Sequence, residues 1–163
     1  MGLEAARPKS IPRNIFHNWG FSLVELMIVT LMVATLVAIA VPIYGRALDQ
    51  ARMAHAIAEI HTLFKEIFLY DTQNGKLPDT LADIDRGKLT DPWGHPYQYL
   101  NFANVKGKGQ MRKDHFLVPL NSRYDLYSMG PDGQSRPPLT AKMSRDDVIL
   151  ANDGGFVGPA SEY

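Results

Sequence analysis

The sequence predicts an α+β protein in which one long amino-terminal α-helix packs on a small antiparallel β-sheet. Three observations predict this fold. An unbroken apolar run covers residues 26–44, and apolar residues then recur every three or four positions over residues 47–68. Short aromatic or β-branched runs, separated by Gly, Asn and charged residues, occupy the carboxyl half. The helix is therefore expected to have a membrane half and a soluble amphipathic half.

Bulk composition excludes several classes of protein. The chain has 163 residues, about the length of one domain, and 45% of them are hydrophobic. Lys and Arg number 17, as do Asp and Glu, so no global positive field favours nucleic acid as a partner. The absence of cysteine excludes disulfide bonds, a thiol nucleophile and a Cys-ligated zinc site.

The apolar run has the length and composition of a membrane span. Thr30 and Thr35 are its only polar side chains between residues 26 and 44. Nineteen residues of helix cover roughly 28 Å, close to the hydrocarbon thickness of a bilayer. A core helix of a soluble protein is an alternative, but the length of the run makes it the weaker one.

Basic residues before the run predict its orientation. Arg7, Lys9 and Arg13 precede the apolar segment, so the positive-inside rule places this end in the cytoplasm and the globular part outside. A secretory signal peptide has a similar layout, but no A-x-A site closes the run, which passes through Pro42 into helix-compatible sequence.

The soluble half of the helix is expected to end near Asn74 and Gly75, with Pro78 just beyond. This predicts one helix of roughly fifty residues, bent near Pro42, where proline interrupts the helical hydrogen bonds. A short helix is expected within residues 78–84.

The sheet is predicted from three short runs, at residues 97–102, 116–120 and 124–128. The segment between the first two, residues 106–113, alternates Lys, Gly and Arg with few apolar residues and is expected to be a solvated loop. Its basic charge could meet an acidic partner surface.

One acid, Glu25, lies at the start of the apolar segment. A carboxylate in hydrocarbon costs a few kcal/mol and needs a partner. Cleavage after Gly20 would create an amino-terminal charge at Phe21, which a neighbouring copy could present to Glu25. The helix dipole also favours a negative charge at this end.

Residues 20–26, Gly-Phe-Ser-Leu-Val-Glu-Leu, together with the apolar run, resemble the signature of type IV pilins and pseudopilins. The resemblance implies that a prepilin peptidase cuts between Gly20 and Phe21 and methylates the new amino terminus. It also implies that Glu25 sets the register between subunits, and Pro42 falls where helices of the family carry a proline.

Two later segments, residues 91–99 and 124–133, look like those of major pseudopilins of type II secretion, the general secretion pathway protein G family. Taken alone, the first is also a rigid turn that feeds a strand, with Trp93 and Tyr97 in the core. The resemblance implies a subunit that polymerises into a periplasmic pseudopilus and drives folded proteins across the outer membrane.

This resemblance implies a domain plan and a set of partners. Residues 1–20 would be a cleaved cytoplasmic leader, residues 21–44 the transmembrane and assembly helix, and residues 45–163 a periplasmic head with a calcium-binding loop region near its end. The expected partners are copies of the same chain, other pseudopilins, the prepilin peptidase, the inner-membrane assembly platform and, before assembly, membrane lipid.

Three acids lie in loop-like sequence near the carboxyl end: Asp132, Asp146 and Asp147. Carboxylates are the hard oxygen ligands that calcium prefers, although Asp in such loops commonly caps turns. The resemblance implies a calcium ion held by these three side chains, with the carbonyls of Met129 and Ser144 as possible additional ligands.

No enzyme is expected, because the sequence has no HExxH, GxSxG or Walker motif. Two alternatives to the pseudopilin remain. A type IV pilin of a surface filament for adhesion or motility would share the first fifty residues, and a monomeric membrane-anchored binding module would not need Glu25. Residues 148–163 receive no functional prediction, except that Asn152 and Asp153 could extend or replace the proposed calcium ligands or simply cap a Gly-rich turn.

Overall fold

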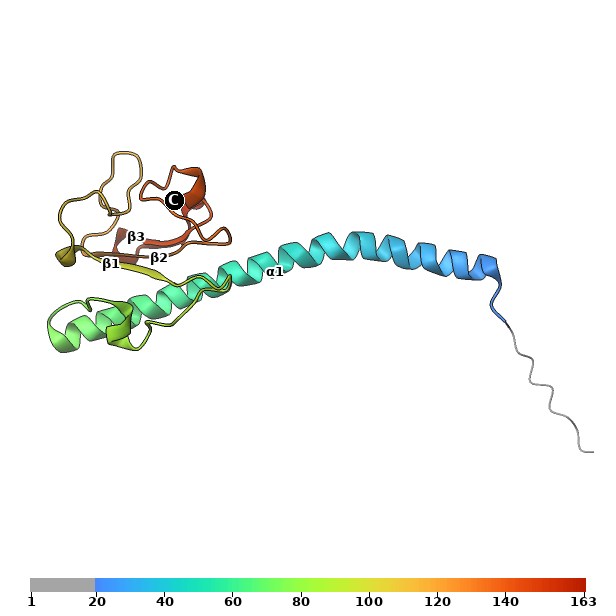
Figure 1. Cartoon of the computed structure of the whole chain (residues 1–163), viewed down its shortest axis with the longest axis horizontal. Helices are drawn as coiled ribbons and strands as arrows, with labels where there is room; N and C mark the ends of the chain where they lie inside the picture. The colour runs from blue at the N-terminus through green and yellow to red at the C-terminus, as the bar shows by residue number, and fades with distance from the viewer. Residues whose placement is uncertain (1–19) are drawn as a thin grey trace, which may run out of the picture. The chain divides into compact units, whose positions relative to one another are not determined.

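A computed structural model describes residues 20–163, which form two units, one up to Ile43 and one from Tyr44 to Tyr163. The predictions for residues 1–19, which include most of the expected leader, lie outside the described residues. Helix α1, Leu23–Asn74, has 52 residues and belongs to both units (Figure 1). Its predicted length and end are confirmed.

Local chemistry accounts for both ends of α1. At the start, the Ser22 hydroxyl accepts a hydrogen bond from the Val24 N–H at 3.2 Å, as an N-cap side chain does. At the other end, Gly75 has a φ of +69° and its N–H donates to the Asp71 carbonyl at 2.8 Å. A left-handed glycine of this kind is a common helix terminator. The helix runs through Pro42 without ending, and the bend expected there stays a prediction.

Four antiparallel strands form the sheet, in the order in which they occur in the chain: β1 (Gln98–Asn101), β2 (Tyr124–Ser128), β3 (Val148–Ala151) and β4 (Phe156–Pro159). Gln98 pairs with Tyr127, Tyr127 with Ile149, and Ile149 with Gly158. The α+β prediction of a long helix and a small antiparallel sheet is therefore confirmed.

The main core lies between the second half of α1 and the sheet. The helix buries one stripe, and these residues repeat at intervals of four, three and four: Ala56, Ile60, Leu63 and Ile67. Alternation along β3 places Val148 and Leu150 in this core, whereas Ile149 and Ala151 join a second cluster. Both faces of β3 are thus covered, which explains why all its residues are apolar.

The details of the sheet differ from the prediction. The strand expected at residues 116–120 is wrong: Asp114 and Leu117 face each other across a tight turn, and Phe116 is fully exposed. Pro119 lacks an N–H for a sheet ladder, which disfavours a strand there. Strands β3 and β4 were not expected. The short helix expected within residues 78–84 is a 3₁₀ helix, Leu81–Ile84.

Candidate functional site

The first half of α1 presents apolar side chains that are exposed in the described part of the chain. Every described residue up to Ala51 is exposed, and the large hydrophobic side chains from Phe21 to Tyr44 are 48% to 78% exposed. Of the described helices, α1 alone is long and apolar enough to cross a membrane. A large exposed apolar surface marks contact with lipid or with another protein.

The two threonines within this surface are satisfied internally. The Thr30 hydroxyl donates to the Met27 carbonyl at 3.0 Å, and Thr35 donates to the Met32 carbonyl at 2.8 Å. In hydrocarbon, where no water is available, a polar group needs a partner within the protein. The hydroxyls of both threonines are therefore compensated within the helix.

Glu25 is the one acid of this surface, in the first turn of α1. Its side chain is exposed, and within residues 20–163 it makes no hydrogen bond or ion pair with another side chain. The two residues of the expected cleavage site, Gly20 and Phe21, precede the helix and are exposed. Glu25 is thus available to a partner from outside the described chain.

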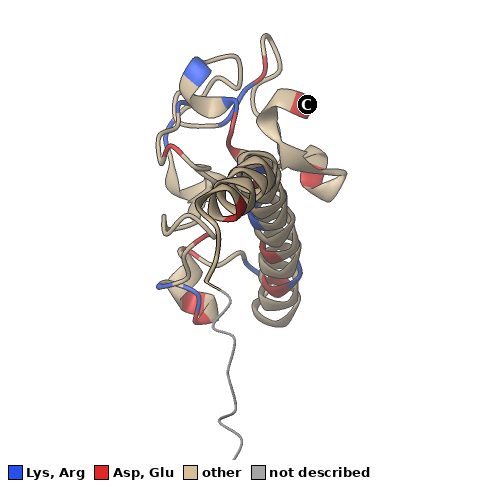
Figure 2. Ribbon diagram, turned by 90° about the vertical axis from the view of Figure 1, so that its right-hand side faces the viewer, with Lys and Arg blue, Asp and Glu red and all other residues tan. Residues whose placement is uncertain are grey.

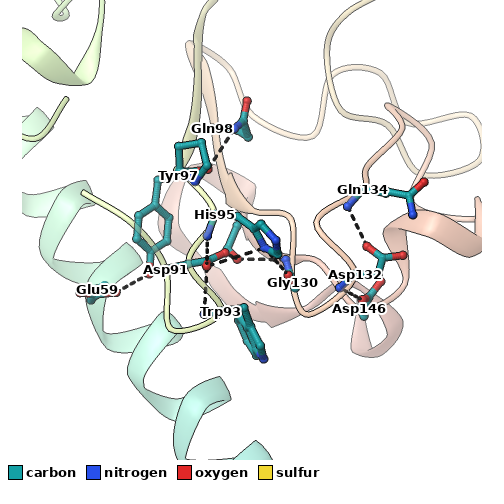
Figure 3. Close-up of polar contacts among 12 residues, drawn as sticks. Glu59, Asp91, Trp93, His95, Tyr97, Gln98, Gly130, Asp132, Gln134 and Asp146 are labelled. Carbon is teal, nitrogen blue, oxygen red and sulfur yellow. Dashed lines mark hydrogen bonds and ion pairs between the residues drawn. The ribbon is translucent and has the colours of Figure 1, made fainter. Parts of the chain in front are cut away.

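Residues 91–97 form hydrogen bonds that hold separate segments of the head together (Figure 3). One oxygen of Asp91 accepts hydrogen bonds from the Trp93 and His95 N–H groups, at 3.1 and 2.8 Å, and the other accepts from the Ser128 hydroxyl at 2.5 Å. The His95 ring lies 3.0 Å from the Gly130 carbonyl. The motif therefore joins the lead-in to β1 to the loop after β2.

The same segment also reaches the helix. The Tyr97 hydroxyl donates to Glu59 of α1 at 2.5 Å, as Figure 3 shows. Burial, followed by the nearby Glu59 carboxylate, raises the pKa of Tyr97, so the hydroxyl stays a donor at physiological pH. Trp93 packs against the main core and Tyr97 is part of it, as expected from the residues.

Two of the expected calcium ligands lie side by side in the loop of residues 129–147, which we call the β2–β3 loop. The Asp132 N–H points at a carboxylate oxygen of Asp146 at 3.4 Å, and the Asp132 carboxylate accepts from the Gln134 N–H at 2.8 Å (Figure 3). Gly130 has a φ of +65°, and a Cβ there would lie 2.3 Å from the Asp146 carbonyl oxygen. Close packing of main chain joins the two parts of the loop.

The third expected ligand, Asp147, is fully buried and is engaged by a basic residue. Its Oδ2 accepts from the Arg112 guanidinium at 2.5 Å and from the Ser135 hydroxyl at 2.6 Å. Burial raises the pKa of Asp147 to about 6, and the Arg112 charge acts against this increase. The carboxylate charge is thus already balanced from within the chain.

The remaining expected ligands do not complete a site. Ser144 is buried, and its hydroxyl both accepts from the Arg136 N–H and donates to the Arg136 carbonyl, each at 2.8 Å. Met129 is half-buried. Among the residues that the structure describes, no group of three His, Asp or Glu side chains could hold a metal. In this arrangement the residues do not fit a calcium ion with the expected ligands, and calcium stays a prediction.

Arg112 is the functional residue that sequence reasoning missed. It belongs to the segment of residues 106–113 that was expected to be a solvated loop, yet its side chain is 3% exposed. Lys106 and Lys108 are exposed as expected. The only signal in the sequence is the preceding Met111, an apolar residue in an otherwise polar run, and it too is buried.

Comparisons with known proteins find several relatives that share one name. The chain is 30% identical over 131 residues to the type II secretion system core protein G of Xanthomonas campestris, covering 71% of this chain and 80% of the relative. It is 29% identical over 136 residues to the protein of the same name from Pseudomonas aeruginosa, covering 71% and 84%. The Aeromonas hydrophila protein of that name is 27% identical over 137 residues, covering 71% and 85%. No family model and no solved structure matches the chain.

Proposed function

Since this chain belongs to the type II secretion system core protein G family, we propose that it is the major structural subunit of that system's pseudopilus. In this proposal, copies of the chain leave the inner membrane and pack their apolar helix halves into a filament. The heads of residues 45–163 lie in the periplasm, and growth of the filament drives folded proteins across the outer membrane. The role is structural and includes no catalysis by this chain.

The observation that carries the proposal is the uncovered apolar surface of α1 before Tyr44. Its large hydrophobic side chains stay 48% to 78% exposed among the residues that the structure describes. Lipid satisfies them before assembly, and other copies of the same surface satisfy them in a filament. Both environments are apolar, so transfer between them needs no large solvation cost.

Glu25 supplies the specificity that apolar contacts lack. Its carboxylate costs about 3 kcal/mol at the middle of a membrane on insertion scales, and less near the interface. After cleavage, the amino terminus at Phe21 of a neighbouring copy places a positive charge at the same level of the helix. Pairing of the two charges fixes one axial register, because a displaced neighbour would leave both charges unpaired.

The proposal includes processing and partners. The prepilin peptidase would cut between Gly20 and Phe21 and methylate the new amine, while Pro42 would let the helix adjust to its neighbours. Other pseudopilins and the inner-membrane platform would supply the remaining contacts. Charges of both signs are spread over the head, as Figure 2 shows in one view, which suits contacts with several proteins better than binding to nucleic acid.

The test is to replace Glu25 by Ala and by Gln in the host cell and to measure filament yield and secretion of exported proteins. We expect both variants to lose both activities, because Gln keeps the shape but not the charge. Thr35→Ala is the matched control, since it removes a polar group of the same surface that bonds only within its own helix.

The other outcomes identify the alternatives. Loss of surface fibres with normal secretion would indicate a type IV pilin, and no change in either would indicate a membrane-anchored module. Mass spectrometry of working filaments should find a chain that begins at a methylated Phe21. Filaments that still carry residues 1–20 would contradict the charge pairing.

A further inference from the structure

The guanidinium of Arg112 contacts three oxygens of the β2–β3 loop, while its Nε is buried without a partner among residues 20–163. It donates to the Ser135 hydroxyl, to the Arg136 carbonyl at 2.9 Å and to Oδ2 of Asp147 at 2.5 Å. Its carbon atom also lies 4.3 Å from the centre of the Tyr127 ring, a cation–π contact. Oxygens of this kind, from a hydroxyl, a carbonyl and a carboxylate, are also the ligands that bind hard cations in proteins.

The main chain of Arg112 is anchored as firmly as its side chain. Its N–H donates to the buried Asp125 carboxylate at 2.6 Å, and its carbonyl accepts from the Leu120 N–H at 3.1 Å. Asp125 is part of β2, so Arg112 reaches the loop from a fixed position beside the sheet. Because the main chain is fixed in this way, only the side-chain torsions of Arg112 remain to be ordered when it binds the loop.

We propose that Arg112 is a built-in cation that closes the β2–β3 loop, so that the head of this chain folds without calcium. The oxygens it contacts are spread over residues 135–147, and a single guanidinium draws them together. In this role it replaces the calcium ion that the sequence resemblance implies at the same loop.

Electrostatics argue against both cations being present. A calcium ion that used Asp147 would lie beside the guanidinium, and two positive charges a few ångströms apart in a buried site repel strongly. Oδ1 of Asp147 is buried without a partner among residues 20–163, so it could offer one oxygen. Calcium takes about six to eight oxygens, and no three His, Asp or Glu side chains among the described residues are grouped to hold a metal.

The first experiment needs no variant. The full chain in detergent micelles is unfolded by heat in EGTA, in about 1 mM calcium and in about 1 mM magnesium, since a ligand bound by the folded state alone would raise the Tm. We expect the same Tm in all three solutions. A Tm that rises by several degrees in calcium but not in magnesium, and no longer does so in Asp147→Asn, would overturn the proposal.

The second experiment removes the cation. Arg112→Met should lower the Tm by roughly 10 °C with or without calcium, because it leaves Asp147 as a buried unpaired charge. Arg145→Met is the matched control: it removes an exposed arginine near the end of the same loop and should leave the Tm almost unchanged. Equal Tm values for Arg112→Met and Arg145→Met would overturn the proposal.

A double variant separates loss of the cation from loss of packing. Arg112→Met combined with Asp147→Leu removes both charges together, and we expect it to regain most of the lost Tm, as apolar replacements of buried ion pairs commonly do. If Arg112→Met fails to fold, the calcium comparison of the unmodified chain still decides the question. The inference concerns the folding of the head and does not depend on the proposed polymerisation.

Discussion

The two halves of α1 are continuous in backbone but opposite in what their side chains contact. From Phe21 to Tyr44, large apolar side chains surround the helix and are all exposed. From Met53 to Ile67, apolar side chains concentrate in one stripe that packs on the sheet. A continuous helix therefore does not imply a single role. The distribution of apolar residues around the helix shows which half packs against the globular part of the chain.

Four of the five acids of α1 follow the same division, and the fifth, Asp49, contacts only Arg52 of the helix itself. Glu59, Glu66 and Asp71 in the second half are each bonded to a residue of the head: Tyr97, Arg86 and Arg123. Glu25 in the first half has no such partner within the described residues. The second half is thus fixed by contacts within one chain, whereas the apolar side chains of the first half stay exposed.

The largest difference in stability is expected between two matched substitutions, one in each half of α1. Ile60 is fully buried and Ile39 is 63% exposed. We expect Ile60→Ala to lower the free energy of unfolding by about 3 to 4 kcal/mol, from lost burial and the cavity left behind. Ile39→Ala should change it by less than about 0.5 kcal/mol.

Denaturant unfolding of the full chain in micelles measures both values. Filament yield should respond in the opposite order, since Ile39 belongs to the proposed assembly surface. Equal losses of stability in the two variants would show that the first half of the helix is also part of the folded head's core.

Much of the fold could be predicted because its signals are local. The apolar run, the stripe and the Asn74–Gly75 stop define α1 on their own. Strand β3, by contrast, consists of four apolar residues with both faces covered, so it lacks the alternation that marks a half-buried strand. In β4, Gly158 and Pro159 are residues that disfavour strands.

Of the residues in the candidate sites, some could be predicted from local sequence and others could not. Glu25 could be found because a carboxylate is conspicuous in an apolar run. Arg112 could not, because its partners Ser135 and Asp147 are distant in the sequence and only the folded loop brings them together. An arginine among lysines and glycines has the composition of a solvated loop, and burial of its side chain is decided by tertiary contacts alone.

A smaller effect is expected at the contact of Tyr97 with the helix. Tyr97→Phe removes the hydroxyl that donates to Glu59 while keeping the buried ring, and hydrogen bonds to charged groups contribute about 1.5 kcal/mol or more. We expect a loss of about 1 to 1.5 kcal/mol, because Glu59 regains water when the hydroxyl is removed.

Tyr44→Phe is the matched control, since Tyr44 is 72% exposed at the end of the apolar half. It should leave the free energy of unfolding unchanged. A loss in Tyr44→Phe as large as that in Tyr97→Phe would mean that the hydroxyls of both halves contribute alike, contrary to the division proposed here.

The smallest effect is expected at Asp71, near the end of α1, and it depends on pH. The Arg123 guanidinium donates two hydrogen bonds to this carboxylate, at 2.6 and 2.9 Å, and these hold the pKa of Asp71 below its ordinary value. A lowered pKa means that the folded state favours the ionised form. The stabilisation is therefore complete above the ordinary pKa of about 4 and is lost as the pH falls through the lower pKa of the folded state.

Asp71→Asn should accordingly be less stable than the unmodified chain at neutral pH, and the gap between their Tm values should close as the pH falls below about 4. Asp49→Asn is the control, because Asp49 is an exposed acid of the same helix whose contact is Arg52, 3.9 Å away on the helix itself. It should show no gap that changes with pH. A gap for Asp71→Asn that stayed constant through the acid range would mean that packing, rather than the charge pair with Arg123, fixes the end of the helix to the head.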